Sequence, residues 1–307
     1  MEIDRSAPTL GEWMDRQVNR LNYRQDTVCM PMSTNVNEVM GEEPRLVDQL
    51  YKDDEGLFEK ANKQNEEIED EVKRSQPLVG AKLPISSLVE MYDANESSEY
   101  HLKAKELAEV YGSLRRIRGD GNCFYRAMLC AELESLFIDE NERRRFTEVC
   151  KGWRDRLMKL GFPEFTTTDF CDWFDELLDE IASGKRNEEA TISSLNEDGP
   201  SNYYVTFFRL VTSGYLRDNS LLYEGFIEGG RNIEQFCRDE IEPMWKDCDH
   251  LGIIALTNAI QVSIRIEYMD RSAAPDGGRH YDFIVEGRPP RLFFLYRPGH
   301  YDVLYKK

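Results

Sequence analysis

A cysteine in an unusual setting is the residue of this sequence best suited to chemistry. Cys123 follows the run Gly-Asp-Gly-Asn, residues 119–122, and precedes the apolar stretch "FYRAML". The two glycines around Asp120 permit positive φ angles and a close approach of the main chain to another group. Asn122 is a residue type favoured at helix N-caps, so the sequence predicts a helix over 122–137 with the cysteine in its first turn.

A cysteine at a helix N-terminus has two properties that acyl-transfer chemistry requires. Unpaired N–H groups and the positive end of the helix dipole favour the thiolate, which is the nucleophilic form. The same N–H groups can stabilise the oxyanion formed when a thiolate attacks a carbonyl. From this stretch alone, a buried cysteine in a tight turn is the alternative. A phosphate-binding loop is excluded, because the third glycine of G-x-G-x-x-G is missing and no P-loop lysine follows.

A nucleophilic cysteine requires a general base, which one of the four histidines of the chain can supply. His101 and His250 lie within charged, helical sequence and are predicted to be surface or structural residues. The other two, His280 and His300, each begin a His-Tyr-Asp triplet. The first triplet follows "PDGGR" in a predicted loop, so His280 is assigned a structural role.

The second triplet lies between two predicted strands, "RLFFLYR" and "YDVLYK". Residues i and i+2 of a strand share one face, about 6–7 Å apart at Cα. Asp302 can therefore orient the imidazole of His300 and stabilise its charged form, while His300 activates Cys123. Because side chains on a sheet are held more rigidly than those on loops, we predict His300 as the base.

The elements expected to position these residues begin with helices. The segment "TTTDFCDWFDELLDEIASG" opens with residues suited to an N-cap and closes at Gly184. Its apolar stripe has helical spacing and is predicted to be core: Phe170, Phe174, Leu177, Leu178 and Ile181. Further helices are predicted for "HLKAKELAEVYGSL", "RDRLMKLG", "NYYVTFFRLVTSGYL" and "IEPMWKDCDHLGIIALTNAI", the last beginning near Pro243.

Strand patterns follow these helices. Residues 261–270, "QVSIRIEYMD", alternate apolar and polar side chains, and "RLFFLYR" and "YDVLYK" are predicted as two further strands. Helices in the middle and a sheet assembled from the C-terminal segments indicate an α+β fold. Neither an internal repeat nor a linker is found from residue 80 onward, so residues 77–307 are predicted to form one domain.

The N-terminal part of the chain has a different character. Residues 1–55 mix short apolar islands with polar stretches and are predicted to be a flexible extension. Residues 56–76 are predicted to be a helical arm that ends at Pro77, because Ile68 and Val72 share one helical face within a charged run. The arm is either a solvated helix at the domain edge or a surface that contacts a partner, and the sequence favours the solvated helix.

The net charge limits the classes of partner. The 58 acidic and 39 basic residues give a formal charge of −19. Such an excess repels nucleic-acid phosphates and anionic membranes, so no nucleic-acid or membrane binding is expected and a basic protein surface is the favoured partner. The first residues do not form a signal peptide, and no apolar run is long enough to span a bilayer.

The cysteines predict free thiols. Their number is odd, their spacing is irregular and no C-x-x-C occurs, which argues against a disulfide framework and against a zinc site. We therefore expect reduced thiols in a cytosolic or nuclear protein. The seven residues are Cys29, Cys123, Cys130, Cys150, Cys171, Cys237 and Cys248.

The strings that carry the candidate chemistry, "GDGNCFYRA" and "LYRPGHYDVLYKK", resemble the otubain branch of the OTU cysteine deubiquitinases. Further stretches with the same resemblance are "SQPLVGAKLPISSLVEMY", "GFPEFTTTDFCDWF", "IEPMWKDCDHLGIIAL" and "VSIRIEYMDR". The resemblance covers approximately residues 56–307, and residues 1–55 lie outside it.

This resemblance implies a papain-like core with a large helical subdomain, in which a helix bearing the nucleophile packs on a small, mostly antiparallel sheet bearing the histidine. It implies thiol-dependent hydrolysis of isopeptide bonds in ubiquitin chains, without metal or cofactor. At the matching positions Cys123 is the nucleophile, His300 the general base and acid, and Asp302 its orienting partner. Asp120 supports the oxyanion loop, and the backbone N–H groups of Asp120, Gly121 and Cys123 are predicted to form the oxyanion hole.

By analogy, the resemblance also implies a monomer that binds ubiquitin, polyubiquitin chains and ubiquitin-conjugating enzymes, with a preference for the proteasome-directing linkage. Two rival hypotheses remain at this stage. One is a pseudoenzyme or regulatory scaffold that binds ubiquitin or a conjugating enzyme without cleaving it. The other is a cysteine enzyme that acts on a different acyl substrate, such as a ubiquitin-like modifier, a thioester or a peptide.

Overall fold

The computed structural model describes residues 76–95, 97–270 and 279–307. The predicted extension over 1–55 and all but the last residue of the predicted arm over 56–76 lie outside the described residues. Within them, no helix combines the length and the apolar character that crossing a bilayer requires.

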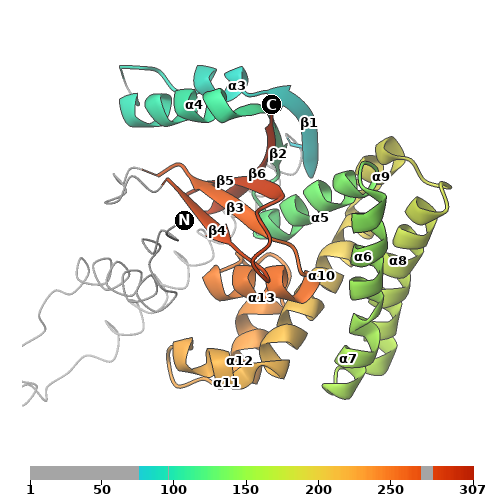
Figure 1. The fold of residues 1–307 in the computed structure, drawn as a ribbon. Helices are drawn as coiled ribbons and strands as arrows, with labels where there is room; N and C mark the ends of the chain where they lie inside the picture. The colour runs from blue at the N-terminus through green and yellow to red at the C-terminus, as the bar shows by residue number, and fades with distance from the viewer. Residues whose placement is uncertain (1–75, 96, 271–278) are drawn as a thin grey trace, which may run out of the picture. The chain divides into compact units, whose positions relative to one another are not determined.

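The strands of the described residues form one six-stranded sheet (Figure 1). Their spatial order is β1-β2-β6-β5-β3-β4; β3 and β5 pair in parallel and the other neighbours are antiparallel. The prediction of a mostly antiparallel sheet in an α+β fold is therefore confirmed. The strands are β1 (Val79–Pro84), β2 (Tyr111–Ile117), β3 (Ile264–Tyr268), β4 (His280–Phe283), β5 (Leu292–Arg297) and β6 (His300–Lys306).

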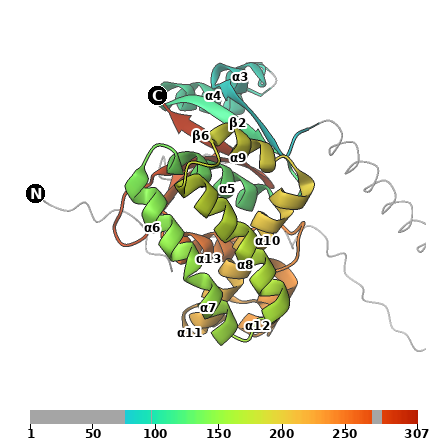
Figure 2. The same cartoon turned by 90° about the vertical axis from the view of Figure 1, so that its right-hand side faces the viewer.

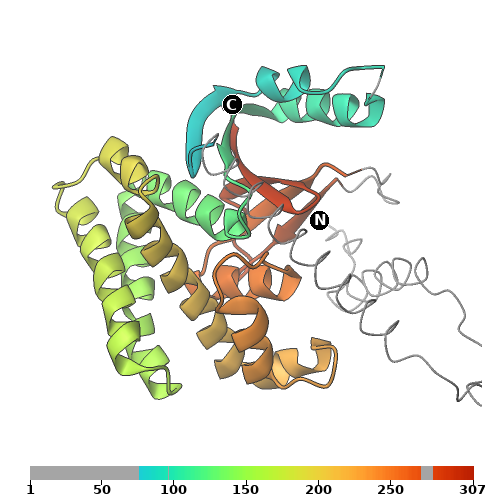
Figure 3. The ribbon, with the colours of Figure 1, turned by 180° about the vertical axis from the view of Figure 1, so that it is seen from behind.

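Helices lie on both sides of this sheet (Figures 1 and 3). On one side are α3 (Ser86–Glu90) and α4 (Ser98–Val110), and on the other are α5 (Cys123–Leu136) and α13 (His250–Ile260). The remaining helices form a large helical subdomain, part of which faces the viewer in Figure 2. They are α6 (Glu140–Lys151), α7 (Trp153–Lys159), α8 (Glu164–Ala182), α9 (Glu188–Ser194), α10 (Asp198–Asp218), α11 (Ser220–Tyr223), η1 (Glu224–Phe226), α12 (Ile233–Phe236) and η2 (Cys237–Ile241).

Helix α5 is the central helix of the domain. All of its residues except Ser135 are buried, as expected for a helix that is covered on every side. Phe124 packs on the sheet, with ring centroids 6.2 Å from Phe294 and 5.2 Å from Tyr301. This packing fixes the start of α5, and therefore Cys123, relative to β5 and β6.

The helical subdomain is held by aromatic contacts between α8 and α10. Phe174 of α8 is fully buried and its ring stacks on Phe207 of α10 at a centroid distance of 4.4 Å. The predicted core stripe of α8 is buried at four of its five positions, whereas Phe170 is only partly covered and packs on Tyr203. The interface makes α10 a rigid neighbour of α5.

Two predicted helix starts are wrong. The last long helix begins at His250, not near Pro243, because Asp249 caps it by accepting a hydrogen bond of 2.7 Å from the Gly252 N–H. Helix α8 begins at Glu164, so its threonines lie inside the helix and do not cap it. The first difference matters for function, since residues 242–249 become a loop.

Three strands of the sheet differ from the sequence prediction. The segment "YGSL" was assigned to a helix, yet Tyr111–Ile117 forms β2 in the middle of the sheet. The segment before it, Val79–Pro84, forms the edge strand β1. The His280 triplet, predicted in a loop, forms the opposite edge strand β4.

We expect Phe174→Ala to destabilise the protein by about 3–5 kcal/mol, because it removes a buried ring and leaves a cavity between α8 and α10. The measurement is equilibrium urea unfolding of both proteins. Phe165→Ala is the matched control on the same helix, since Phe165 is 87% exposed and its loss should change the midpoint little. Equal effects of the two substitutions would contradict the packing described above.

Candidate active site

The pairing of β2 with β6 brings the candidate nucleophile and base together. Because the strands are antiparallel, the end of β2 lies beside the start of β6, which is His300. Residues 118–122 then turn from β2 into α5. This turn passes directly against the imidazole: a Cβ placed on Gly119 would lie 3.3 Å from Nδ1 of His300. Cys123 follows at the first position of α5 and is 3% exposed.

The fully buried carboxylate of Asp302 holds the imidazole. Its Oδ1 lies 2.9 Å from Nε2 of His300 and also accepts a hydrogen bond of 2.9 Å from the Ile117 N–H at the end of β2. Its Oδ2 accepts a hydrogen bond from Arg297. With Nε2 bound to a carboxylate, Nδ1 is the ring nitrogen directed at the turn that carries Cys123.

The charges of this pair are mutually stabilised. Burial alone would lower the pKa of His300, but its hydrogen bonds to Asp302 and Cys123, and their negative charges, raise it from 6.5 to about 9. Burial would raise the pKa of Asp302, yet His300, Arg297 and the Ile117 N–H hold it below its ordinary 3.8. The geometry therefore favours an imidazolium beside an ionised Asp302 at neutral pH.

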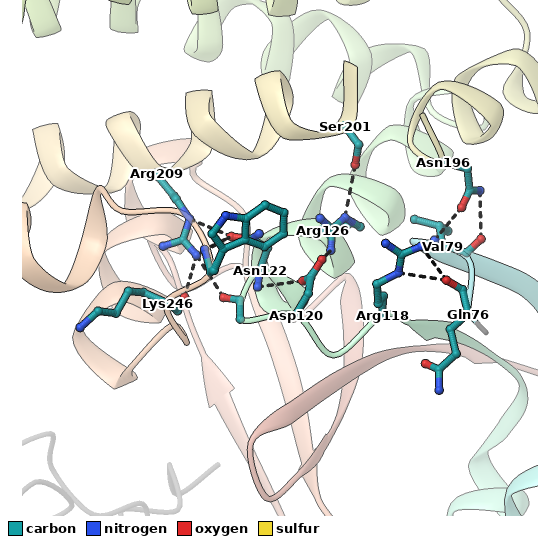
Figure 4. Close-up of polar contacts among 12 residues, drawn as sticks. Gln76, Val79, Arg118, Asp120, Asn122, Arg126, Asn196, Ser201, Arg209 and Lys246 are labelled. Carbon is teal, nitrogen blue, oxygen red and sulfur yellow. Dashed lines mark hydrogen bonds and ion pairs between the residues drawn. The ribbon is translucent and has the colours of Figure 1, made fainter. Parts of the chain in front are cut away.

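Asp120 is bound by Arg126 of α5 and by the backbone of its own turn (Figure 4). Both carboxylate oxygens accept hydrogen bonds of 2.8 Å from Nη1 of Arg126, which is fully buried. Oδ1 also accepts the Asn122 N–H at 3.0 Å. These contacts indicate that Asp120 shapes the turn.

The backbone N–H groups of the turn differ in their availability. The Asp120 N–H donates to the Arg118 carbonyl at 3.2 Å, so this predicted oxyanion donor is engaged in the structure. Within α5 the first backbone donor is the Arg126 N–H, which bonds the Asn122 carbonyl. Among the described residues no partner appears for the N–H groups of Gly121 and Cys123, which leaves both of these donors available to a ligand.

Glycine is required at position 121 for two reasons. Its φ angle is +72°, a conformation that other residues adopt at a cost. A Cβ there would lie 2.2 Å from the backbone oxygen of Trp245. The loop over 242–249 therefore lies against the catalytic turn without space for a side chain.

Asn122 occupies the N-cap position, but its side chain does not cap the helix as predicted. The side chain is fully buried, and its Oδ1 accepts hydrogen bonds from Arg209 of α10 and from the Trp245 N–H at 3.1 Å. Asn122 thus joins the turn to α10 and to the 242–249 loop. The N-cap preference predicted the position of Asn122 correctly, but the hydrogen bonds of its side chain go to Arg209 and Trp245.

The other three histidines lie elsewhere. His280 is on the edge strand β4, with a side chain that is 41% exposed and an Nδ1 that is 3.9 Å from Glu267. His250 is half-buried beside Tyr281 and Phe283, and the desolvation lowers its pKa to about 3. His101 bonds the Tyr92 carbonyl at 2.8 Å through Nδ1.

The described cysteines are all unpaired thiols: Cys123, Cys130, Cys150, Cys171, Cys237 and Cys248. Burial raises the pKa of the thiols of Cys130, Cys150, Cys171, Cys237 and Cys248. In the described ranges no group of histidine, cysteine and carboxylate side chains is arranged to hold a metal ion.

Sequence reasoning missed the two buried arginines that hold the turn, Arg126 and Arg209. A signal for both was available. Arg126 follows the cysteine inside a nearly apolar helix, and Arg209 interrupts the apolar run "VTFFRLV". A charged residue within such a stretch is buried only if it is paired or hydrogen-bonded, so each predicts a specific polar partner.

Comparisons with known proteins agree with this geometry. Residues 71–306 match the family model described as Peptidase C65 Otubain. The "Ubiquitin thioesterase otubain-like" protein of Caenorhabditis elegans is 49% identical over 257 residues, which cover 83% of this chain and 89% of the relative. Human "Ubiquitin thioesterase OTUB1" is 42% identical over 243 residues, covering 79% and 88%.

Solved structures match as well. The structure titled "The structure of a ceOTUB1 ubiquitin aldehyde UBC13~Ub complex" contains a chain that is 50% identical to this one. The match has a TM-score of 0.76 and covers 80% of this chain and 99% of that chain. A second structure, titled "The structure of h/ceOTUB1-ubiquitin aldehyde-UBCH5B~Ub", is 48% identical with a TM-score of 0.77, covering 82% and 99%.

We expect the imidazole of His300 to titrate near pH 9 and Asp302→Asn to move this midpoint toward 6.5, because a carboxylate partner is lost. NMR of ring-labelled histidine measures the midpoint, with His300→Gln identifying the signal. The raised pKa also implies a stability contribution that is complete below pH 6.5 and disappears as the pH rises through about 9. An unchanged midpoint in Asp302→Asn would contradict the ion pair.

Proposed function

The chain belongs to the peptidase C65 otubain family, and from this premise we propose how its own residues carry out deubiquitination. It is a cysteine-type deubiquitinase in which Cys123 is the nucleophile and His300 the general base and acid. The observation that carries this assignment is the alignment of buried Asp302, the imidazole of His300 and the thiol of Cys123 at the start of α5.

The reaction is an acyl transfer in two steps. The thiolate of Cys123 attacks the carbonyl carbon of the C-terminal glycine of ubiquitin, and the resulting oxyanion accepts hydrogen bonds from the Gly121 and Cys123 N–H groups. The imidazolium of His300 protonates the departing lysine amine, which leaves a thioester on Cys123. His300 then removes a proton from water, the hydroxide attacks the thioester, and the thiolate and the ubiquitin carboxylate are released.

The aspartates have separate roles in this mechanism. Asp302 holds the Nε2 proton of His300 whether or not Nδ1 is protonated, and it stabilises the imidazolium that forms when Nδ1 takes up a proton. Asp120 holds the Asn122 N–H and Arg126, so it supports the turn without taking part in proton transfer.

The narrow access to the nucleophile suits a glycine-terminated substrate. The Cys123 thiol is almost covered, and the turn and the 242–249 loop lie so close that Gly121 has no room for a side chain. An extended glycine backbone is thin enough to reach such a thiol. A substrate with a side chain at the scissile residue would require these segments to separate.

Ubiquitin and ubiquitin-conjugating enzymes are the proposed partners. The titles of the matching structures name complexes of ceOTUB1 or h/ceOTUB1 with ubiquitin aldehyde and with UBC13~Ub or UBCH5B~Ub. Regulation of conjugating enzymes by binding is therefore the second candidate function.

We also propose a preference for the proteasome-directing chain linkage. Its support is the family membership, since the two relatives described above carry the same enzyme name and the fold is shared along most of the chain. Linkage choice requires a second ubiquitin to place one particular lysine at Cys123, so it depends on surfaces away from the catalytic residues.

We expect His300→Ala to reduce labelling by a C-terminally electrophilic ubiquitin probe about 100-fold or more, and His280→Ala to leave it near normal. The two histidines begin the same triplet, which makes His280→Ala a matched control. Cys123→Ala should abolish the adduct. Labelling of folded Cys123→Ala, or loss of labelling in His280→Ala alone, would overturn the assignment.

The linkage preference predicts faster cleavage of proteasome-directing di-ubiquitin than of the non-degradative signalling linkages. Initial rates over a panel of di-ubiquitins, with a minimal ubiquitin ester as the reference, measure it directly. Equal rates would remove the linkage proposal and leave the hydrolase assignment intact. Binding of conjugating enzymes by Cys123→Ala protein would separate the second candidate function from hydrolysis.

A further inference from the structure

Arg209 of α10 is a buried cation behind the catalytic turn. Its side chain is fully covered, and the guanidinium lies over the ring of Tyr125 at 4.4 Å from the centroid. An isolated buried charge is costly unless its donors are satisfied, so the position of Arg209 requires a set of specific acceptors.

Those acceptors belong to two segments that are far apart in the sequence (Figure 4). From the catalytic turn, the Gly121 carbonyl accepts from Nη2 at 3.0 Å, and Asn122 Oδ1 accepts from Nη2 at 2.7 Å and from Nε at 3.2 Å. From the other segment, the carbonyls of Ile241 and Lys246 accept at 2.9 and 2.6 Å. One guanidinium therefore joins the turn to residues 241–246.

Arg209 is compensated differently from its neighbour Arg126. Arg126 forms an ion pair with Asp120 at 2.8 Å. Among the described residues no carboxylate lies within ion-pair distance of Arg209, whose acceptors are carbonyl and amide oxygens. A carboxylate would satisfy better a cation that served stability alone. The acceptors of Arg209 are neutral and three of the four are backbone carbonyls, which indicates a role in placing the backbone.

The contacts of Arg209 and Asp120 fix one peptide plane from both sides. The Gly121 carbonyl is held by Arg209, and the N–H of the same peptide, which belongs to Asn122, is held by Asp120 at 3.0 Å. The N–H groups on either side of this plane are those of Gly121 and Cys123. Fixing this plane restricts their directions, since only the two rotatable backbone bonds of Gly121 and of Asn122 separate it from the neighbouring peptides.

Helix α10 supplies both attachments. Ser201 accepts a hydrogen bond of 3.3 Å from Nε of Arg126, which in turn holds Asp120, while Arg209 binds the turn directly. The two positions are eight residues apart, about 12 Å along the helix axis. The turn is therefore fixed to one rigid element at two points.

We propose that Arg209 is a positioning residue for hydrolysis, which fixes the Gly121–Asn122 peptide so that the Gly121 and Cys123 N–H groups are aligned on the oxyanion before substrate binds. This inference rests on the proposed function of the same site. The positioning role requires a guanidinium. Its planar fork of N–H groups reaches four acceptors at once, which the single ammonium of lysine cannot do. Arg209 therefore stabilises the tetrahedral intermediate and does not contribute to the binding of ubiquitin.

The test compares reactions with and without an oxyanion in wild type and Arg209→Lys. We expect kcat on a fluorogenic ubiquitin C-terminal amide to fall about 100-fold, the loss typical of one oxyanion donor, with KM within about threefold. Ubiquitin aldehyde, whose carbon is attacked by Cys123 to give a tetrahedral hemithioacetal, should inhibit about 100-fold more weakly. Alkylation of Cys123 by iodoacetamide, which displaces iodide and forms no oxyanion, should change less than about threefold.

Arg217→Lys is the matched control. Arg217 lies on the same helix and forms an ion pair with Glu242 beside the same loop, but it does not contact the turn. Its substitution should leave kcat and aldehyde inhibition near wild type. Asn122→Ala provides a smaller perturbation if Arg209→Lys does not fold, because it removes the acceptor of two of the five hydrogen bonds, and the same selective loss is expected.

The outcomes distinguish a failure of the positioning role from a failure of the proposed function. If folded Arg209→Lys retains wild-type kcat and aldehyde affinity, the positioning role is wrong and the proposed function stands. If aldehyde inhibition, kcat and alkylation fall by the same factor, Arg209 acts on the thiol or on folding, and the oxyanion role is again wrong. If wild type itself neither cleaves the amide nor binds ubiquitin aldehyde, the proposed function fails.

Discussion

The structure depends on the hydrogen bonds of the buried Asp302 carboxylate, which connect the imidazole of His300 to the end of β2. Its Oδ1 bonds both the imidazole of His300 and the Ile117 N–H, so the same atom orients the base and holds the end of β2. The turn that carries Cys123 leaves β2 one residue later. A change at this carboxylate is therefore expected to alter the charge of His300 and the position of Cys123 together. This link explains why a fully buried acid remains ionised: three donors replace its hydration.

Two buried arginines, Arg126 and Arg209, hold the turn that carries Cys123 in different ways. Arg126 forms an ion pair with Asp120 of the turn, whereas Arg209 binds backbone oxygens of the turn and of residues 241–246. Burial lowers the pKa of Arg209, although a guanidinium remains charged at any physiological pH. Both arginines depend on α10, which packs on α8 through Phe174 and Phe207. Aromatic packing remote from the chemistry thus supports the rigidity of the turn.

The sequence was sufficient for the helix that begins at Cys123 and for the last strand, which was predicted from Tyr301 and begins one residue earlier, at His300. It was not sufficient for β2. The segment follows α4 without a helix breaker, a register shift between Tyr111 and Ser113 disrupts its alternation, and Arg115 is buried by Glu134 and Tyr305. Strand periodicity requires one exposed face, which β2 lacks. The contact that aligns the site was therefore beyond pattern analysis, since it depends on which strands become neighbours.

The two His-Tyr-Asp triplets show that neighbours, rather than local sequence, decide the chemistry. Both lie on strands with the same i, i+2 relation between histidine and aspartate. On the edge strand β4, Asp282 is bound on both oxygens by Arg265 from β3, at 2.7 and 2.8 Å, and His280 remains exposed. On β6, a central strand, the aspartate is buried against the end of β2 and the imidazole faces the turn at Gly119. Arg265 occupies both oxygens of Asp282, whereas Arg297 occupies only Oδ2 of Asp302 and leaves Oδ1 to His300 and the Ile117 N–H. Placement within the sheet thus converts one of two equal sequence motifs into a candidate catalytic pair.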